Sequence, residues 1–149
     1  MSLQDWQNSG WVRAHQSSQE EMRGLLSVVD RDLDDASKQN LSADWRFGIA
    51  YNAALKLCAM LLHASGYRPE KTLQHYRTIE ALPLILGDSR KRDARYLDDC
   101  RKKRNTAEYD MAGVTSANEA TELLSFAQGL RKEVLDWLAK NHPELLPRQ

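Results

Sequence analysis

A run of four basic residues, followed by an amide, a carboxylate and a phenol, is the part of this chain best suited to chemistry. The run spans residues 101–104, and Asn105, Glu108 and Tyr109 follow it. Steps of three and four residues put Arg104 on one predicted helical stripe with four apolar residues. These are Leu97, Cys100, Ala107 and Met111. Because a guanidinium keeps its charge, Arg104 on that stripe needs an acidic partner, an anion or a polar interface.

Two interpretations of this segment remain open. Arg101, Arg104 and Asn105 on one helix face suit phosphate recognition or a polar dimer interface. The simpler interpretation is a salt bridge from Arg104 to Glu108, four residues on, worth about 0.3 kcal/mol and in the less favourable order. Lys102 extends the basic surface. His75 follows the turn after the longest apolar segment and could face a cleft, although a single histidine there more often packs or caps.

The sequence offers little for metal or cofactor binding. The four histidines are scattered, and none lies at helical spacing from another histidine or a cysteine, so we expect no zinc site. Residues 30–35 are acidic but lack the glycine and terminal glutamate of an EF-hand loop. All seven glycines are isolated, which argues against a glycine-rich phosphate loop. We therefore predict neither a metal nor a cofactor.

The charges balance overall but are segregated along the chain. Lys plus Arg equals Asp plus Glu at 21 each, so no global field attracts nucleic acid or a membrane. Residues 88–104 carry eight basic and four acidic side chains, whereas residues 20–35 carry six carboxylates and two arginines. Two solvated helix faces are the simplest explanation, and a basic patch that meets phosphate is the alternative.

The cysteines and the N-terminal sequence indicate a cytoplasmic protein. Cys58 and Cys100 fall on apolar stripes, as buried free thiols do in a reducing compartment. The N-terminus has no apolar run typical of a signal peptide, and no 18 consecutive residues are apolar. We therefore expect no membrane partner.

Helical periodicity covers almost every segment. The longest apolar helix should begin at Ser42 and stop at residues 65–66, and its wide apolar arc predicts the most buried, central position. Other helices should begin after Ser17 and Ser18, span about 72–86 with an interruption or a bend at Pro83, start near 89 and end by Gly113, and run from Ser116 or Asn118 to Asn141. No run alternates with a period of two, so we predict no sheet. The expected fold is a single all-α domain over residues 1–149, an antiparallel bundle of four to five helices.

Two stretches resemble the HEPN superfamily, small helical domains of prokaryotic toxin–antitoxin and defence systems. Residues 50–57 (Ala-Tyr-Asn-Ala-Ala-Leu-Lys-Leu), the Gly-Tyr-Arg-Pro turn at 66–69 and His75 look like the family's second helix with its Ala-Tyr-x-Ala-Ala start, Gly-x-x-Pro turn and histidine. Residues 104–109 (Arg-Asn-Thr-Ala-Glu-Tyr) resemble the family's Arg-Asn-x-x-x-His motif. With the helix order, the resemblance covers about residues 42–138.

The resemblance implies a homodimer whose two motifs share a cleft, where active members cleave RNA without a metal through the motif's arginine and histidine. Arg104 and Asn105 match that motif, but Tyr109 stands in the place of the histidine. A phenol, with a pKa near ~10, is a poor general base at neutral pH, whereas imidazole, near ~6.5, is well placed. Tyr109 is better suited to hydrogen bonding or stacking, and Glu108 or His75 are the candidate substitutes as base.

These observations lead to two hypotheses. The first is a HEPN-like homodimer that binds RNA or nucleotide phosphate through Arg101, Lys102, Arg104 and His75, as a ribonuclease toxin or a catalytically degenerate relative. The second is a non-enzymatic interaction module with a polar dimer interface made by Arg104, Glu108 and Tyr109. In that case the acidic first helix docks on an antitoxin or a nucleotidyltransferase.

Overall fold

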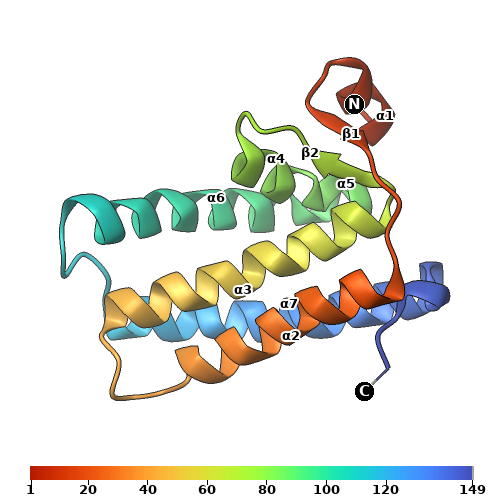
Figure 1. The fold of residues 1–149 in the computed structure, drawn as a ribbon. Helices are drawn as coiled ribbons and strands as arrows, with labels where there is room; N and C mark the ends of the chain where they lie inside the picture. Colours follow the sequence, from red (N-terminus) through yellow and green to blue (C-terminus); the bar gives the residue numbers. More distant parts are fainter. Residues whose placement is uncertain (149) are drawn as a thin grey trace.

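A bundle of long helices forms the body of the protein. The structure, a computed structural model, describes residues 1–148. Figure 1 shows α2 (Gln19–Ala36), α3 (Ala43–Ala64) and α7 (Ala117–Asn141) lying side by side, with α6 (Lys91–Asn105) along another face of α3. The prediction of a mostly helical bundle is confirmed.

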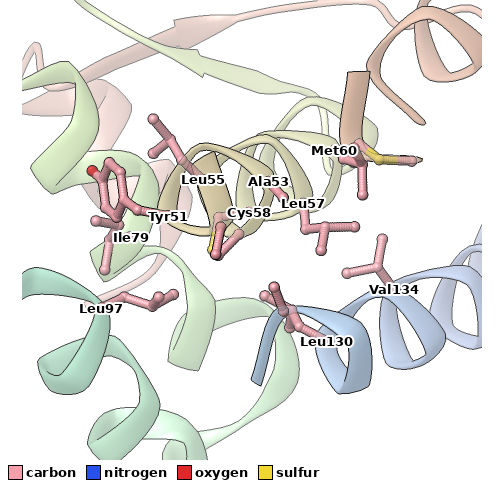
Figure 2. Packing of buried hydrophobic residues seen from close by; sticks show 14 of the residues in the cluster. Tyr51, Ala53, Leu55, Leu57, Cys58, Met60, Ile79, Leu97, Leu130 and Val134 are labelled. Atoms are coloured by element: carbon pink, nitrogen blue, oxygen red, sulfur yellow. The ribbon is translucent and has the colours of Figure 1, made fainter. Parts of the chain in front are cut away.

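The helix α3 lies at the centre, as its sequence predicts. Ser42 caps its N-terminus by accepting a hydrogen bond from the backbone N–H of Trp45. Its apolar side chains are buried on nearly every side, so neighbouring helices must cover it all round. In Figure 2, Leu97 of α6 and Leu130 and Val134 of α7 converge on it.

Both cysteines are buried free thiols, as predicted. Burial raises the pKa of Cys58 and of Cys100 to about 12. Since the thiolate is the reactive form, both thiols are inert at neutral pH and serve as small apolar packing groups.

By length and composition alone, α3 could cross a membrane. However, 67% of its most apolar stretch is buried inside the fold, as the central helix of a bundle requires. The prediction of a cytoplasmic protein without a membrane partner stays a prediction.

Predicted helix starts agree closely with the structure, whereas the basic helix ends differently. Ser18 and Ser116 cap α2 and α7 by accepting hydrogen bonds from backbone N–H groups in the first turn. The helix α6 begins at Lys91 after a 3₁₀ turn (Asp88–Arg90) and ends at Asn105. Its continuation is a π-helical turn, Thr106–Asp110. Wide turns of this kind are frequent at functional sites, and this one contains Glu108 and Tyr109.

The predicted helix over about 72–86 is two short helices. These are α4 (Gln74–Glu80) and α5 (Leu82–Leu86), and Pro83 lies in the first turn of α5. A proline is tolerated there because its missing N–H has no intrahelical partner to bond. The break therefore falls two residues before the proline, at Ala81. Leu73 precedes α4 in the left-handed region, with φ of 56°.

The prediction of no sheet is wrong. The strands β1 (Val12–Ala14) and β2 (Tyr67–Pro69) pair antiparallel, with Arg13 opposite Arg68. A short helix, α1 (Leu3–Asn8), precedes β1 and was also not predicted. Strands of three residues are too short for a period of two to show in the sequence. Trp6 and Val12 pack with Leu62 and Ala81, so this N-terminal unit covers one end of α3.

The deeply buried arginine is Arg46 of α3 and not Arg104. Its side chain is 6% exposed. The Nε atom donates to the backbone oxygen of Ala36 at 2.9 Å, and Nη2 donates to the hydroxyl of Thr121 at 3.3 Å. A cation at the last carbonyls of α2 also complements the helix dipole. Arg46 therefore ties α2 and α7 to α3.

We expect Arg46→Met to lower the free energy of unfolding by about 2 kcal/mol, because hydrogen bonds made by a charged group are lost while the aliphatic stem is kept. Urea denaturation measures the change. Arg23→Met, at an exposed position of α2, is the control and should stay within about 0.5 kcal/mol of the wild type. Equal stability of the two variants would show that Arg46 does not hold the helices together.

Candidate functional site

Arg104 lies at the edge of the core, with polar groups on one side and an aromatic ring on the other. Its Nε forms an ion pair with Glu108 at 2.8 Å, and Nη1 donates to the side-chain oxygen of Asn105 at 3.3 Å. The guanidinium carbon is 5.9 Å from the ring centroid of Tyr51, within cation–π range. The salt bridge to Glu108 is therefore formed, and the Arg104 side chain is still 26% exposed.

Arg104 also lines a groove of about 730 Å³. One wall is the first half of α3, and the facing wall is the end of α6 with the π turn. Gly48 of α3 faces the stem of Arg104, since a Cβ built at Gly48 would lie 3.8 Å from Cγ of Arg104. That distance is an ordinary contact, so alanine would fit at position 48 and a longer side chain would displace the Arg104 stem. The residues of the groove used below are Asp32, Asp44, Trp45, Asn52, Arg104 and Glu108.

The inner end of the groove is polar and held by hydrogen bonds. The buried carboxylate of Asp32 accepts from Nδ2 of Asn52 at 2.6 Å and from Nε of Arg31 at 3.0 Å. A buried carboxylate needs such partners to stay charged. The hydrogen bond from Asn52 joins α3 to α2 at this end of the groove.

Asp44 holds the loop that closes the groove on its third side. Its carboxylate accepts from the backbone N–H of Gly113 at 2.6 Å and of Thr115 at 3.1 Å. The hydrogen bond from Gly113, followed by those from Thr115, keeps the pKa of Asp44 below its usual value despite the opposing effect of burial. Gly113 has φ of 80°, a conformation that favours glycine.

Basic groups from three helices lie near Tyr51 and His75. The His75 ring centroid of α4 lies 6.5 Å from that of Tyr51. Burial lowers the pKa of His75, and the charges of Arg104, Lys56 and Arg101 lower it further. Burial raises the pKa of Tyr51, against the opposing effect of Arg101 and Arg104. Its hydroxyl is buried and has no hydrogen-bond partner within residues 1–148. We call Lys56, His75, Arg101 and Arg104 the basic cluster.

The other predicted site residues divide between this cluster and the surface. Arg101 donates to Asp98 at 2.8 Å, and Nζ of Lys102 lies 3.4 Å from the same carboxylate. Lys102 is otherwise exposed. Tyr109 is 71% exposed and lies on the π turn. The structure thus brings His75, Arg101, Arg104, Asn105 and Glu108 together and leaves Lys102 and Tyr109 outside.

Sequence reasoning missed Tyr51, Gly48, Asn52 and Asp44. Tyr51 and Asn52 lie in the stretch that resembles the HEPN family's second helix, but an apolar run gives a tyrosine no role beyond packing. Only the contact between the two helices shows that the Tyr51 ring of α3 lies against the guanidinium of Arg104 on α6. Near Arg104, the His, Cys and carboxylate groups within residues 1–148 form no metal-binding cluster.

Known proteins do not identify the site. Comparisons with protein-family models, curated proteins and solved structures find no significant match. Any functional assignment therefore rests on the residues and their geometry.

We expect Asp44→Ala to lower stability at pH 7 by about 1 kcal/mol, since a partly exposed carboxylate loses two hydrogen bonds to backbone N–H groups. The folded pKa of Asp44 is lowered, so its contribution is complete above the usual value of 3.8 and is lost as the pH falls below it. In urea denaturation, the difference from the wild type should be constant down to about pH 4 and should shrink as the pH is lowered further. Asp136→Ala, at an exposed position of α7, should show no such dependence, and a difference that persists at low pH would contradict the role of Asp44.

Proposed function

We propose that this protein is a HEPN-like homodimer that binds RNA or nucleotide phosphate through Arg101 and Arg104. The observation that carries the proposal is the basic cluster around Tyr51, because its members come from α3, α4 and α6. Salt bridges between neighbours on one helix would not bring basic groups from three helices together, whereas the binding of an anion would.

The charges of the basic cluster favour a phosphate. Asp98 is shared by Arg101 and Lys102, so one carboxylate faces two cations. Glu108 balances Arg104, and no carboxylate contact within residues 1–148 involves Lys56 or His75. An excess of positive charge therefore remains. Two guanidiniums can grip phosphate oxygens through pairs of N–H groups, which lysines cannot do.

His75 is the better candidate than Tyr109 for a general base. Its lowered pKa leaves the imidazole neutral at pH 7, which is the form that accepts a proton. Tyr109 lies exposed on the π turn, outside the basic cluster. In this proposal, ribonuclease activity depends on His75, while Tyr109 stacks or packs at the edge of the cleft.

The exposed apolar side chains beside the groove support a dimer. Trp45 lies on the groove, and Tyr109 and Met111 lie on and just after the π turn that forms its wall. All three are large and mostly exposed. A second copy packed there would remove them from water and place two Arg104 side chains near a common cleft.

Arg104→Ala should weaken the binding of a short single-stranded RNA by at least about tenfold, because a hydrogen-bonded charge contact to phosphate is lost. Fluorescence anisotropy over a series of salt concentrations measures it, and the slope of log affinity against log salt should become shallower by about 0.7. Arg23→Ala removes one exposed arginine from the acidic helix α2 and serves as the control. Unchanged affinity in Arg104→Ala would overturn the proposal.

The alternative is a non-enzymatic interaction module, favoured by the pairing of Arg104 with Glu108 within the chain. In that case Arg104, Glu108 and Tyr109 form a polar interface between copies, and the acidic α2 docks on an antitoxin or a nucleotidyltransferase.

The alternative predicts a change of assembly without RNA binding. Arg104→Ala should shift the mass measured by light scattering from dimer toward monomer, because the polar interface loses its central cation, and the wild type should bind no RNA at moderate salt. Arg23→Ala is again the control. An unchanged mass together with salt-sensitive RNA binding by the wild type would exclude this alternative.

A further inference from the structure

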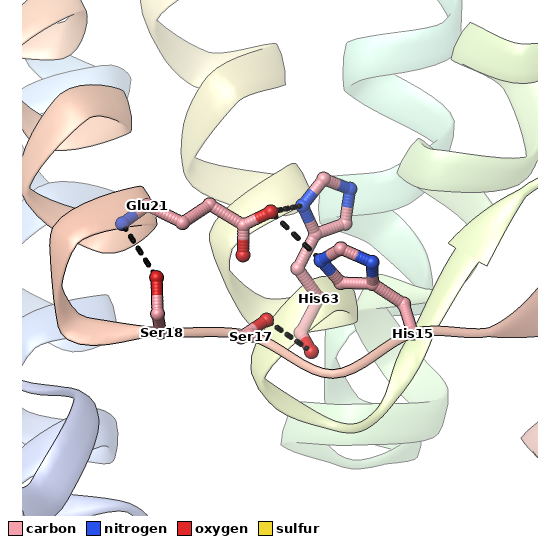
Figure 3. Close-up of polar contacts among 5 residues, drawn as sticks. All are labelled: His15, Ser17, Ser18, Glu21 and His63. Carbon is pink, nitrogen blue, oxygen red and sulfur yellow. Dashed lines mark hydrogen bonds and ion pairs between the residues drawn. The ribbon is translucent and has the colours of Figure 1, made fainter.

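Two histidines and a glutamate meet at the end of α3 remote from Arg104. Figure 3 shows His15 and His63 both directed at the carboxylate of Glu21. Nε2 of His15 lies 2.7 Å from Oε1 of Glu21, and Nδ1 of His63 lies 3.6 Å from the same oxygen. The potential ligand atoms of the three residues all lie within 4.8 Å of one another.

The backbone holds each of the three residues in place. The N–H of His15, just after β1, donates to the carbonyl of Gly66 at 2.8 Å. The hydroxyl of Ser17 donates to the carbonyl of His63 at 2.8 Å. Glu21 lies in the first turn of α2, where its N–H donates to the capping hydroxyl of Ser18 at 3.1 Å. Three separate elements therefore converge with little freedom, which is what a preformed site requires.

Hydrogen bonding within the protein satisfies only part of this cluster. The contact between His15 and Glu21 is a good hydrogen bond, but 3.6 Å is too long for one between His63 and Glu21. Both Oε2 of Glu21 and Nδ1 of His63 are buried, and neither has a hydrogen-bond partner within residues 1–148. Such groups are costly to leave unpaired, typically by about 1–3 kcal/mol each. A further group between the three side chains would satisfy them.

We propose that His15, Glu21 and His63 bind a divalent transition-metal cation of the zinc class. Two imidazole nitrogens and one carboxylate oxygen are a donor set that zinc accepts, with a fourth position left for water. Bonds of about 2.1 Å place tetrahedral ligands about 3.4 Å apart, so small side-chain rotations close the present spacing. Spacing within one helix predicts no zinc site for this sequence, but it cannot detect ligands that come from three separate elements.

The bound ion acts as a structural clamp, separate from the Arg104 groove. It joins the segment after β1 to α2 and α3 and so fastens the N-terminal unit to the bundle. Gly48, which lies beside Arg104, is fifteen residues from His63 on α3, and this spacing corresponds to about 22 Å. The metal site and the phosphate site can therefore be tested independently.

The test uses the full chain after treatment with a chelator and its removal. Titration with Zn²⁺ in a calorimeter should show one ion bound per chain, and the melting temperature should rise by several degrees because the ion binds only the folded state. Co²⁺ should give the visible absorption of a four-coordinate ion. Glu21→Gln, which keeps the shape of the side chain, and His63→Ala should each weaken Zn²⁺ binding by at least tenfold.

His142→Ala is the matched control, because Nδ1 of His142 also lies 3.6 Å from a glutamate, Glu144, but without a second histidine in that group. It should bind Zn²⁺ as the wild type does. No binding to the wild type, or equal binding by the wild type and Glu21→Gln, would overturn the proposal. If His63→Ala does not fold, as judged by circular dichroism, the comparison with Glu21→Gln decides.

Discussion

The need to enclose α3 on all sides organises the whole molecule. An isolated helix with an apolar surface nearly all round is not stable in water, so α2, α6 and α7 must surround it, and the N-terminal unit must cover its end. The polar clusters therefore lie where this cover stops. At one end the groove with Arg104 opens between α3 and the π turn, and at the other end His15, Glu21 and His63 meet. Both candidate sites are consequences of where the core ends.

The sequence predicts the parts of this fold that depend on local patterns. Serine caps and apolar stripes located α2, α3 and α7 to within a residue or two, because capping and periodicity act within one element. The hairpin of β1 and β2 could not be predicted in this way, since each strand has three residues and owes its form to its partner. The π turn likewise follows a sequence that continues the helical period, and the contacts of Asp44 with Gly113 and Thr115 hold the chain just beyond it.

The same division applies to the sites. Spacing predicted that Arg104 and Glu108 face each other, and the structure confirms it. Spacing also placed Arg104 within the core, whereas the buried guanidinium belongs to Arg46, whose hydrogen-bond acceptors lie on two other helices. Tyr51 and His75 join Arg104 through contacts between helices. The cluster of His15, Glu21 and His63 is the clearest case, because its members share no helix and no periodicity.

The salt bridge between Arg104 and Glu108 is compatible with phosphate binding. Partly exposed pairs four residues apart on a helix stabilise a protein by only about 0.3–0.5 kcal/mol, so exchanging the carboxylate for another anion costs little. The Tyr51 ring, by contrast, is buried, and its contact with the guanidinium does not involve Glu108. Glu108 then keeps Arg104 oriented in the free protein, and a phosphate bound as proposed would have two cationic partners, Arg101 and Arg104, where the carboxylate of Glu108 has one. This difference favours the phosphate, and it exists only because α6 carries Arg101 and Arg104 one turn apart.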